Sequence, residues 1–143
     1  MKEIIYTQRV EFGDCDPAGI VWFPNFFRWI DAASRNFFVQ CGVPPWTETT
    51  KTMGLIGTPI VDTQARFVKS ATYGDVLQIH TSIGEWRRKS FVQHYRVTRG
   101  DAGSPGGVDL IMACEEVRIF AGHREDGSLC ALPVPEEIRK LCE

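Results

Sequence analysis

The hydrophobic pattern of the chain has a helical period in only one long segment. Between residues 24 and 41 apolar side chains recur at spacings of three and four, and Gly42 followed by Pro44 supplies a stop signal. Further apolar residues such as Trp29 and Ala33 fall between these positions. The pattern predicts one helix of about five turns. Because the helix is apolar around much of its circumference, we expect other structure to enclose most of it.

The remaining apolar segments have the composition of strands. Residues 4–13 are rich in β-branched and aromatic side chains, and four more such runs follow at 58–71, 76–86, 90–98 and 108–121. The connection 43–57 is predicted to hold a short helical piece at most, and residues 133–142 a short closing helix. Short turns between successive strands predict an antiparallel meander, since parallel neighbours need long crossovers. The predicted fold is α+β, an antiparallel sheet of about five strands wrapped around one central helix.

Length and charge narrow the possible partners. The 143 residues, 43% of them hydrophobic, suit a single domain over 1–143. A formal charge of −2 gives no overall basic field, so nucleic acid is not an expected partner.

The start, Met1 to Ile5, lacks the apolar core of a signal peptide, and no apolar run approaches the roughly 20 residues that span a bilayer. We therefore expect a cytoplasmic protein with no membrane partner.

Five cysteines, an odd number without a C-x-x-C pair, predict reduced thiols and no metal site. Cys15 is the only one with a possible chemical role. It could act as a nucleophile if His80, His94 or His123 approached it.

The strongest candidate for chemistry is the acidic turn before the helix. Asp14 and Asp16 lie in a segment that Pro17 and Gly19 mark as a tight turn, and Pro24 suits a first helical turn. An aspartate of ordinary pKa is ionised at neutral pH and can act as nucleophile or general base without a histidine. Free amides at a helix start can stabilise an oxyanion. In the alternative interpretation both acids only bind turn amides, which is the role we favour for Asp14.

Longer sequence blocks carry a family resemblance. EFGDCDPAGIVW at 11–22, the segment 24–36, GTPIV at 57–61 and EWRRKSFVQ at 85–93 resemble the 4-hydroxybenzoyl-CoA thioesterases, a group of hotdog-fold acyl-CoA thioesterases. The short D-x-D-x-x-G-x-V core is common to many hotdog thioesterases, whereas the longer blocks favour the hydroxybenzoyl group. The similarity extends over nearly the whole chain. The resemblance implies the branch of these enzymes that uses an aspartate on this turn rather than a glutamate on the helix.

The resemblance implies hydrolysis of 4-hydroxybenzoyl-CoA to 4-hydroxybenzoate and CoA, without a cofactor. Asp16 would be the catalytic carboxylate, either attacking the thioester to give a mixed anhydride or activating water. The backbone N–H of Phe23 would bind the oxyanion, with the Gly19 turn nearby. Trp22 and Phe26 could line a slot for the ring, although aromatic residues on such a helix are more often part of the core.

By the same resemblance, Asp31 would lie at the far end of the pocket near a substrate hydroxyl, with Thr58 in the pocket wall. An acid on an otherwise apolar helical segment must be exposed or paired to be tolerated. The alternative is therefore an acid that faces solvent or pairs with Arg28 or Arg35, three and four residues away.

A basic cluster, Arg87-Arg88-Lys89, joins two predicted strands. Arginine binds phosphate with two parallel hydrogen bonds and lysine binds it as a point charge, so the cluster suits coenzyme A. The alternative is a solvated cluster without a ligand, and Arg118 and Arg124 are weaker candidates for the phosphates.

Two further functions remain open from the sequence. One is a thioesterase for aliphatic acyl-CoA or acyl-carrier-protein thioesters, and the other is a non-catalytic acyl-CoA binder. The uncovered edges of a five-stranded sheet predict association, as a homodimer or a homotetramer with sites near the subunit interfaces.

Overall fold

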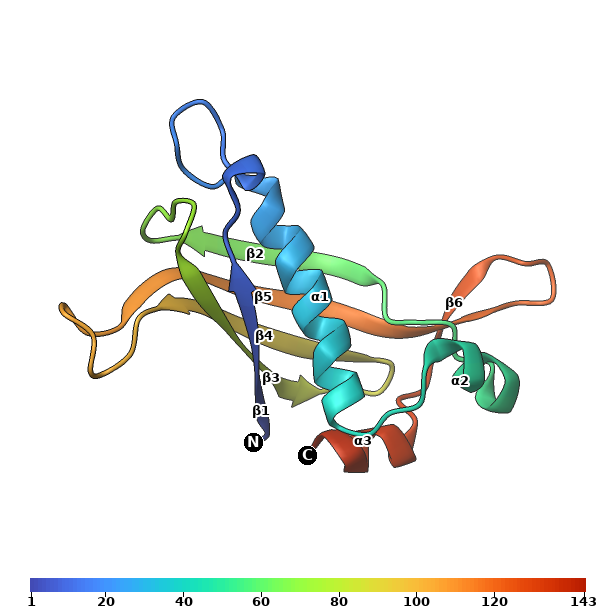
Figure 1. Ribbon diagram of the computed structural model, residues 1–143. Coiled ribbons are helices and arrows are strands. Elements are labelled where there is room, and N and C mark those ends of the chain that lie inside the picture. The colour runs from blue at the N-terminus through green and yellow to red at the C-terminus, as the bar shows by residue number, and fades with distance from the viewer.

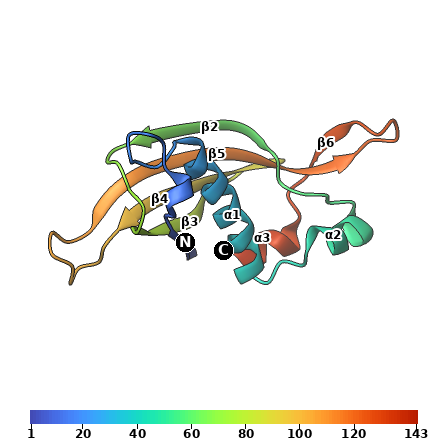
Figure 2. The same cartoon turned by 45° about the horizontal axis from the view of Figure 1, so that its top comes forward.

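A six-stranded antiparallel sheet curves around one long helix (Figures 1 and 2). The computed structural model describes residues 1–143. The strands are β1 (Glu3–Arg9), β2 (Ile60–Phe67), β3 (Val76–Trp86), β4 (Ser90–Arg99), β5 (Asp109–His123) and β6 (Leu129–Leu132). The helices are α1 (Pro24–Gln40), α2 (Trp46–Met53) and α3 (Glu136–Cys142). The predicted α+β arrangement is confirmed. None of these helices combines the length and the apolar character needed to cross a membrane.

The strand order β1-β3-β4-β5-β2 corrects the predicted meander. β3, β4 and β5 are successive neighbours, but β2 lies at the far edge beside β5 rather than beside β3. The connection 68–75 is long enough for this, because three strand spacings are only about 14 Å. The sequence signals a turn at 73–75, but it does not show that the chain crosses the sheet before that turn.

The boundaries of several elements differ from the prediction. β1 stops at Arg9 rather than at residue 13, because 12–14 form a 3-10 turn in which Asp14 accepts the Glu11 N–H. β2 occupies 60–67 instead of 58–71. The connection after α1 holds an eight-residue helix that ends at Gly54, whose φ of 69° lies in the left-handed region. β6, which pairs with the end of β5, was not predicted.

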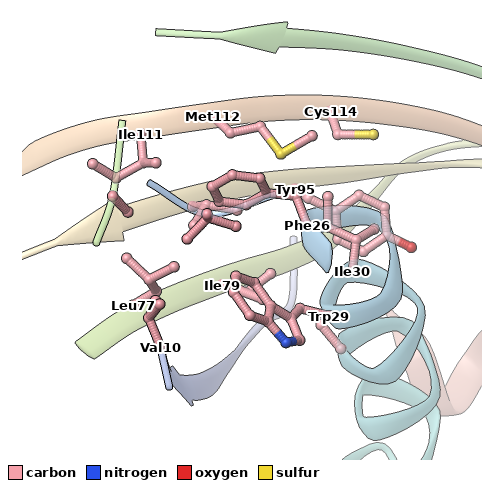
Figure 3. Packing of buried hydrophobic residues seen from close by; sticks show 14 residues of the cluster. Val10, Phe26, Trp29, Ile30, Leu77, Ile79, Tyr95, Ile111, Met112 and Cys114 are labelled. Atoms are coloured by element: carbon pink, nitrogen blue, oxygen red, sulfur yellow. The ribbon is translucent and has the colours of Figure 1, made fainter. Parts of the chain in front are cut away.

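One face of α1 supplies the centre of the core. The buried residues of the helix are Phe26, Trp29, Ile30, Ala33, Ser34, Phe37 and Phe38. They contribute to two hydrophobic clusters, one around the first half of α1 and the other around its second half. Figure 3 shows the first cluster, with side chains of α1 packed against those of β3, β4 and β5. Burial of each large apolar side chain contributes roughly 1.5–3 kcal/mol to stability.

The opposite face of α1 is exposed, contrary to the predicted enclosure. Arg28, Asp31, Arg35 and Val39 all lie on this face. The intervening apolar residues, such as Trp29 and Ala33, belong to the same stripe as Ile30, because positions three and four residues apart share one face of a helix. A single chain therefore covers only one side of α1.

Candidate active site

Asp14 fastens the acidic turn to the start of α1. One carboxylate oxygen accepts the Glu11 N–H at 2.9 Å, and the other accepts Arg28 Nη2 at 3.3 Å. Its backbone carbonyl accepts the Trp22 N–H at 2.9 Å and Asn25 Nδ2 at 2.8 Å. Both carboxylate oxygens are thus engaged within the turn and the first helical residues. The structure agrees with the predicted scaffold role of Asp14.

Asp16 is held in place by one carboxylate oxygen only. Its Oδ1 accepts the Ala18 N–H at 2.9 Å, and the half-buried side chain has no partner at Oδ2. The Asp16 carbonyl accepts the Gly19 N–H at 2.9 Å. Gly19 has a φ of 82°, a conformation that glycine adopts without strain. The Gly19 N–H is already bonded inside the turn. Gly19 therefore contributes to the site through its backbone conformation, which orients Asp16.

The helix start presents an unused amide beside this turn. Phe23 precedes the first helical residue, Pro24, and the Phe23 N–H donates to no protein acceptor, while those of Trp22, Asn25 and Phe26 are all bonded. Proline at the first helical position has no N–H of its own to offer. The positive end of the helix dipole points towards this free N–H. The Phe23 N–H can therefore donate one hydrogen bond to an oxyanion.

The aromatic residues around the helix start divide between surface and core. The Trp22 side chain is exposed, whereas Phe26 is 4% exposed and packs edge-on against Trp29 and Phe67. An apolar hollow of about 330 Å³ lies beside the turn and includes Phe23, Phe26 and Phe67 in its lining. Phe26 therefore belongs to the core, in agreement with the alternative interpretation, and also contributes to the lining of the hollow.

The structure brings Asp31 and Thr58 together. The Asp31 side chain is 71% exposed and pairs with Arg118 at 3.1 Å, not with Arg28 or Arg35. Nη1 of the same arginine donates to the Thr58 carbonyl at 2.8 Å. Both residues line a pocket of about 460 Å³, which is separate from the hollow at the helix start.

Arg118 belongs to a buried polar network that is not among the features predicted from the sequence. Its Nε donates to Glu116 at 2.6 Å, and both side chains are almost fully buried. The network continues through Tyr95 to Gln93, whose Oε1 accepts the Tyr95 hydroxyl at 2.8 Å and the Ser34 hydroxyl at 2.7 Å. A usable sequence signal was the inward position of residue 118, since it alternates with Cys114 and Phe120, which face the core.

Burial determines how this network titrates. Burial raises the pKa of Glu116 above its usual range, against the opposing effect of the Arg118 guanidinium. Burial raises the pKa of Tyr95 as well. For Arg118, burial lowers the pKa, but the oxygens of Tyr95, Glu116 and Asp31 outweigh this effect, and the net shift is upward. The arginine therefore stays charged.

The basic hairpin lies at the other end of α1 from the acidic turn. Arg87 makes two hydrogen bonds of 3.1 Å to Glu85, which raise the pKa of the arginine, whereas Arg88 and Lys89 are exposed and have no ion-pair partner. The Arg88 carbonyl accepts the Val134 N–H, so the hairpin contacts the segment before α3 (Figure 1). The 17 residues of α1 span about 25 Å. One chain alone does not gather the predicted site residues.

The alternative based on Cys15 finds no support. Its thiol lies 3.9 Å from the Glu11 carbonyl, while His80, His94 and His123 interact with other groups in the sheet and its loops. No group of three or more His, Cys, Asp or Glu side chains is placed to hold a metal ion.

Comparison with known proteins identifies the family. The model of the thioesterase-like superfamily matches residues 10–140. This chain belongs to that superfamily. A 4-hydroxybenzoyl-CoA thioesterase of Pseudomonas sp. (strain CBS-3) is 55% identical to this thioesterase-superfamily member over 142 residues, which cover 99% of this chain and 98% of the relative.

Solved structures agree with this assignment. One is a 4-hydroxybenzoyl-CoA thioesterase mutant, with an aspartate replaced by asparagine, complexed with 4-hydroxybenzoyl-CoA. It matches with a TM-score of 0.93 and 52% identity, covering 100% of both chains. A gentisyl-coenzyme A thioesterase matches with a TM-score of 0.77 and 31% identity over 95% of this chain and 99% of that one. The predicted thioesterase family and hotdog fold are confirmed.

The different bonding of the two acids predicts different effects on stability. Asp14→Ala removes the acceptor of the Glu11 N–H and the partner of Arg28, and should lower the free energy of unfolding by about 1–2 kcal/mol. Asp16→Asn keeps an oxygen acceptor for Ala18 and should change it by less than about 0.5 kcal/mol. Urea unfolding at one fixed protein concentration measures both. Equal losses in the two variants would mean that Asp16 is also a scaffold residue.

Proposed function

We propose that this protein hydrolyses an aromatic acyl-CoA thioester, 4-hydroxybenzoyl-CoA, to 4-hydroxybenzoate and CoA. The observation that carries the proposal is that the turn before α1 presents a free Asp16 carboxylate oxygen and the helix start presents the free Phe23 N–H. The name of the Pseudomonas relative, 55% identical over almost the full length, supports the choice of substrate. We propose further that residues 1–143 act as one domain.

Asp16 can serve the reaction in two ways. As a nucleophile, its free oxygen attacks the thioester carbonyl carbon, the carbon–sulfur bond breaks, and water then hydrolyses the mixed anhydride. As a general base, it takes a proton from the water that attacks the same carbon. In both routes one water is consumed, and the carboxylate and the CoA thiol are released. The Phe23 N–H stabilises the negative oxygen that forms on the thioester. Neither route needs a cofactor or a metal.

The remaining predicted residues would bind the two ends of the substrate. Phe26, which lines the hollow, and the exposed Trp22 would flank the acyl ring, and Asp31 and Thr58 would face its hydroxyl. For the CoA phosphates we assign the main role to Arg88 and Lys89, because the Arg87 guanidinium is already paired with Glu85.

We propose that the site is completed by a second copy of the chain. All eight residues of β2 are exposed, and this edge strand displays Ile60, Val61 and Phe67 without a neighbour on its outer side. An unpaired apolar edge of this kind favours strand pairing with another chain. Antiparallel pairing about a two-fold axis would place the Phe67 end of one β2 beside the Ile60 end of the other.

Such pairing would bring the separated groups of residues together. The Phe67 ring contacts Phe23 and Phe27 at the helix start, whereas Ile60 lines the pocket that contains Asp31. The turn of one copy would therefore face the Asp31 pocket of the other. The exposed outer face of α1 leaves room for two dimers to associate into a tetramer. Five free cysteines suit a reducing compartment, so we propose the cytoplasm.

Asp16→Asn tests the catalytic proposal. Loss of the nucleophile or base should lower kcat for 4-hydroxybenzoyl-CoA at least about 10²-fold, with CoA binding and the circular dichroism spectrum unchanged. Thiol release measures turnover, and Asp101→Asn in an exposed loop is the matched control. Retained turnover in Asp16→Asn would contradict the proposal. Tight, saturable binding of thioesters by the wild-type protein without turnover would favour the acyl-CoA binder instead.

Mixing of variants tests the shared site. Asp16→Asn and Asp31→Ala should each be impaired alone with 4-hydroxybenzoyl-CoA. Random reassembly of equal amounts makes half of the dimers mixed, each with one intact site, so about a quarter of wild-type activity should return. Sites contained within one chain would give no recovery at all. Mixing Asp16→Asn with the wild type is the control, since it should give about half of the activity under either arrangement.

A further inference from the structure

Arg118 binds three different groups with three different nitrogens. Nε donates to Glu116, Nη1 to the Thr58 carbonyl and Nη2 to Asp31, at 2.6, 2.8 and 3.1 Å. Its side chain is only 5% exposed, yet the Asp31 side chain it reaches is 71% exposed. A buried cation on β5 thus extends to the pocket surface and bridges α1 to the segment before β2.

From this geometry we infer that Arg118 is a positioning residue that makes the pocket selective for acyl rings carrying a hydroxyl opposite the thioester. The inference rests on the proposed function, in which Asp31 and Thr58 face that hydroxyl. Arg118 also lines this pocket, but each of its three side-chain nitrogens already donates to a protein group, so we assign it no hydrogen bond to the hydroxyl. It fixes the relative position of the two groups that face the hydroxyl.

The bridge leaves one Asp31 oxygen available. Oδ1 accepts from Arg118, and Oδ2 has no protein partner. An exposed aspartate without such a contact samples several rotamers and must be ordered when a ligand binds. With Oδ1 held, Oδ2 points in a defined direction before the substrate arrives. A phenolic O–H that donates to a carboxylate forms a short, strong hydrogen bond.

The charge balance keeps Asp31 a strong acceptor. Glu116 lies closer to Arg118 than Asp31 does, at 2.6 Å against 3.1 Å, so Asp31 shares the guanidinium with a second, buried acid. Asp31 is therefore oriented by Arg118 without being neutralised by it. A lone arginine at this position would compete with the substrate hydroxyl for the Asp31 charge.

The rest of the network holds Arg118 itself in place. Glu116 also lies 3.4 Å from the Tyr95 hydroxyl, and Tyr95 is linked through Gln93 to Ser34, on α1. Ser34 lies one turn beyond Asp31, so the network returns to the same helix. Replacing a buried ion pair by apolar residues is often neutral or stabilising, so stability alone does not account for this pair. Positioning of the pocket does.

Two variants with different effects on charge test the inference. Arg118→Lys keeps the charge beside Glu116, but one ammonium group cannot span all three partners. The paired replacement of Arg118→Met and Glu116→Leu removes both buried charges together and protects the fold if the single variant is unstable. Arg96→Met is the matched control, since Arg96 pairs with Glu3 across strands β4 and β1.

The readout is the ratio of kcat/KM for 4-hydroxybenzoyl-CoA to kcat/KM for benzoyl-CoA. We expect this ratio to fall at least about tenfold in both Arg118 variants. The fall should come from a lower kcat/KM for 4-hydroxybenzoyl-CoA, while benzoyl-CoA turnover changes less than about threefold. In an Asp31→Asn background the Arg118 replacement should change the ratio little further, because the two side chains act as one unit.

Equal loss with both substrates, or an unchanged ratio in the folded double-replacement protein, would overturn the inference while the proposed function stands. A wild-type protein that hydrolyses neither aromatic thioester would instead overturn the proposed function, and the inference with it.

Discussion

Burial of one face of α1 against the concave side of the sheet is the constraint on which the other features depend. It fixes the helix start, where Asp14 ties the acidic turn to Asn25 and Arg28 and leaves the Phe23 amide free. It also fixes the middle of the helix, where Ser34 joins the buried network and Asp31 reaches Arg118. In the proposed function, chemistry and recognition thus share one helix about 25 Å long.

A single chain leaves this arrangement incomplete. The acidic turn, the Asp31 pocket and the basic hairpin lie at three different levels along α1, and β2 offers an exposed edge between the first two. Association through β2 would have two effects. It would cover an apolar strand edge, and it would bring the acidic turn of one copy to the Asp31 pocket of another. In this account the subunit interface is a part of the active site.

The sequence predicted the features that local patterns determine. The helix from Pro24 and the strand from Val76 to Trp86 follow from hydrophobic period and stop signals. Turn chemistry accounts for the hydrogen bonds of Asp14 and Asp16 to turn amides. The position of β2 beside β5 was not predictable from a short turn, because it depends on the path of a connection. In the alternative interpretation Asp31 would face solvent or pair with Arg28 or Arg35, whereas its partner in the structure, Arg118, lies 87 positions away in the sequence. Contacts of this range depend on strand register, which no local pattern records.

The central claim is that this member of the thioesterase-like superfamily acts on an aromatic acyl-CoA. The most direct measurement compares kcat/KM of the wild-type protein for 4-hydroxybenzoyl-CoA, its 3-hydroxy isomer and a medium-chain acyl-CoA, by thiol release under one set of conditions. The account predicts that 4-hydroxybenzoyl-CoA is preferred over the medium-chain thioester by at least about 10²-fold, because a short pocket with a polar far end rejects an alkyl chain. Preference for the aliphatic thioester would contradict it.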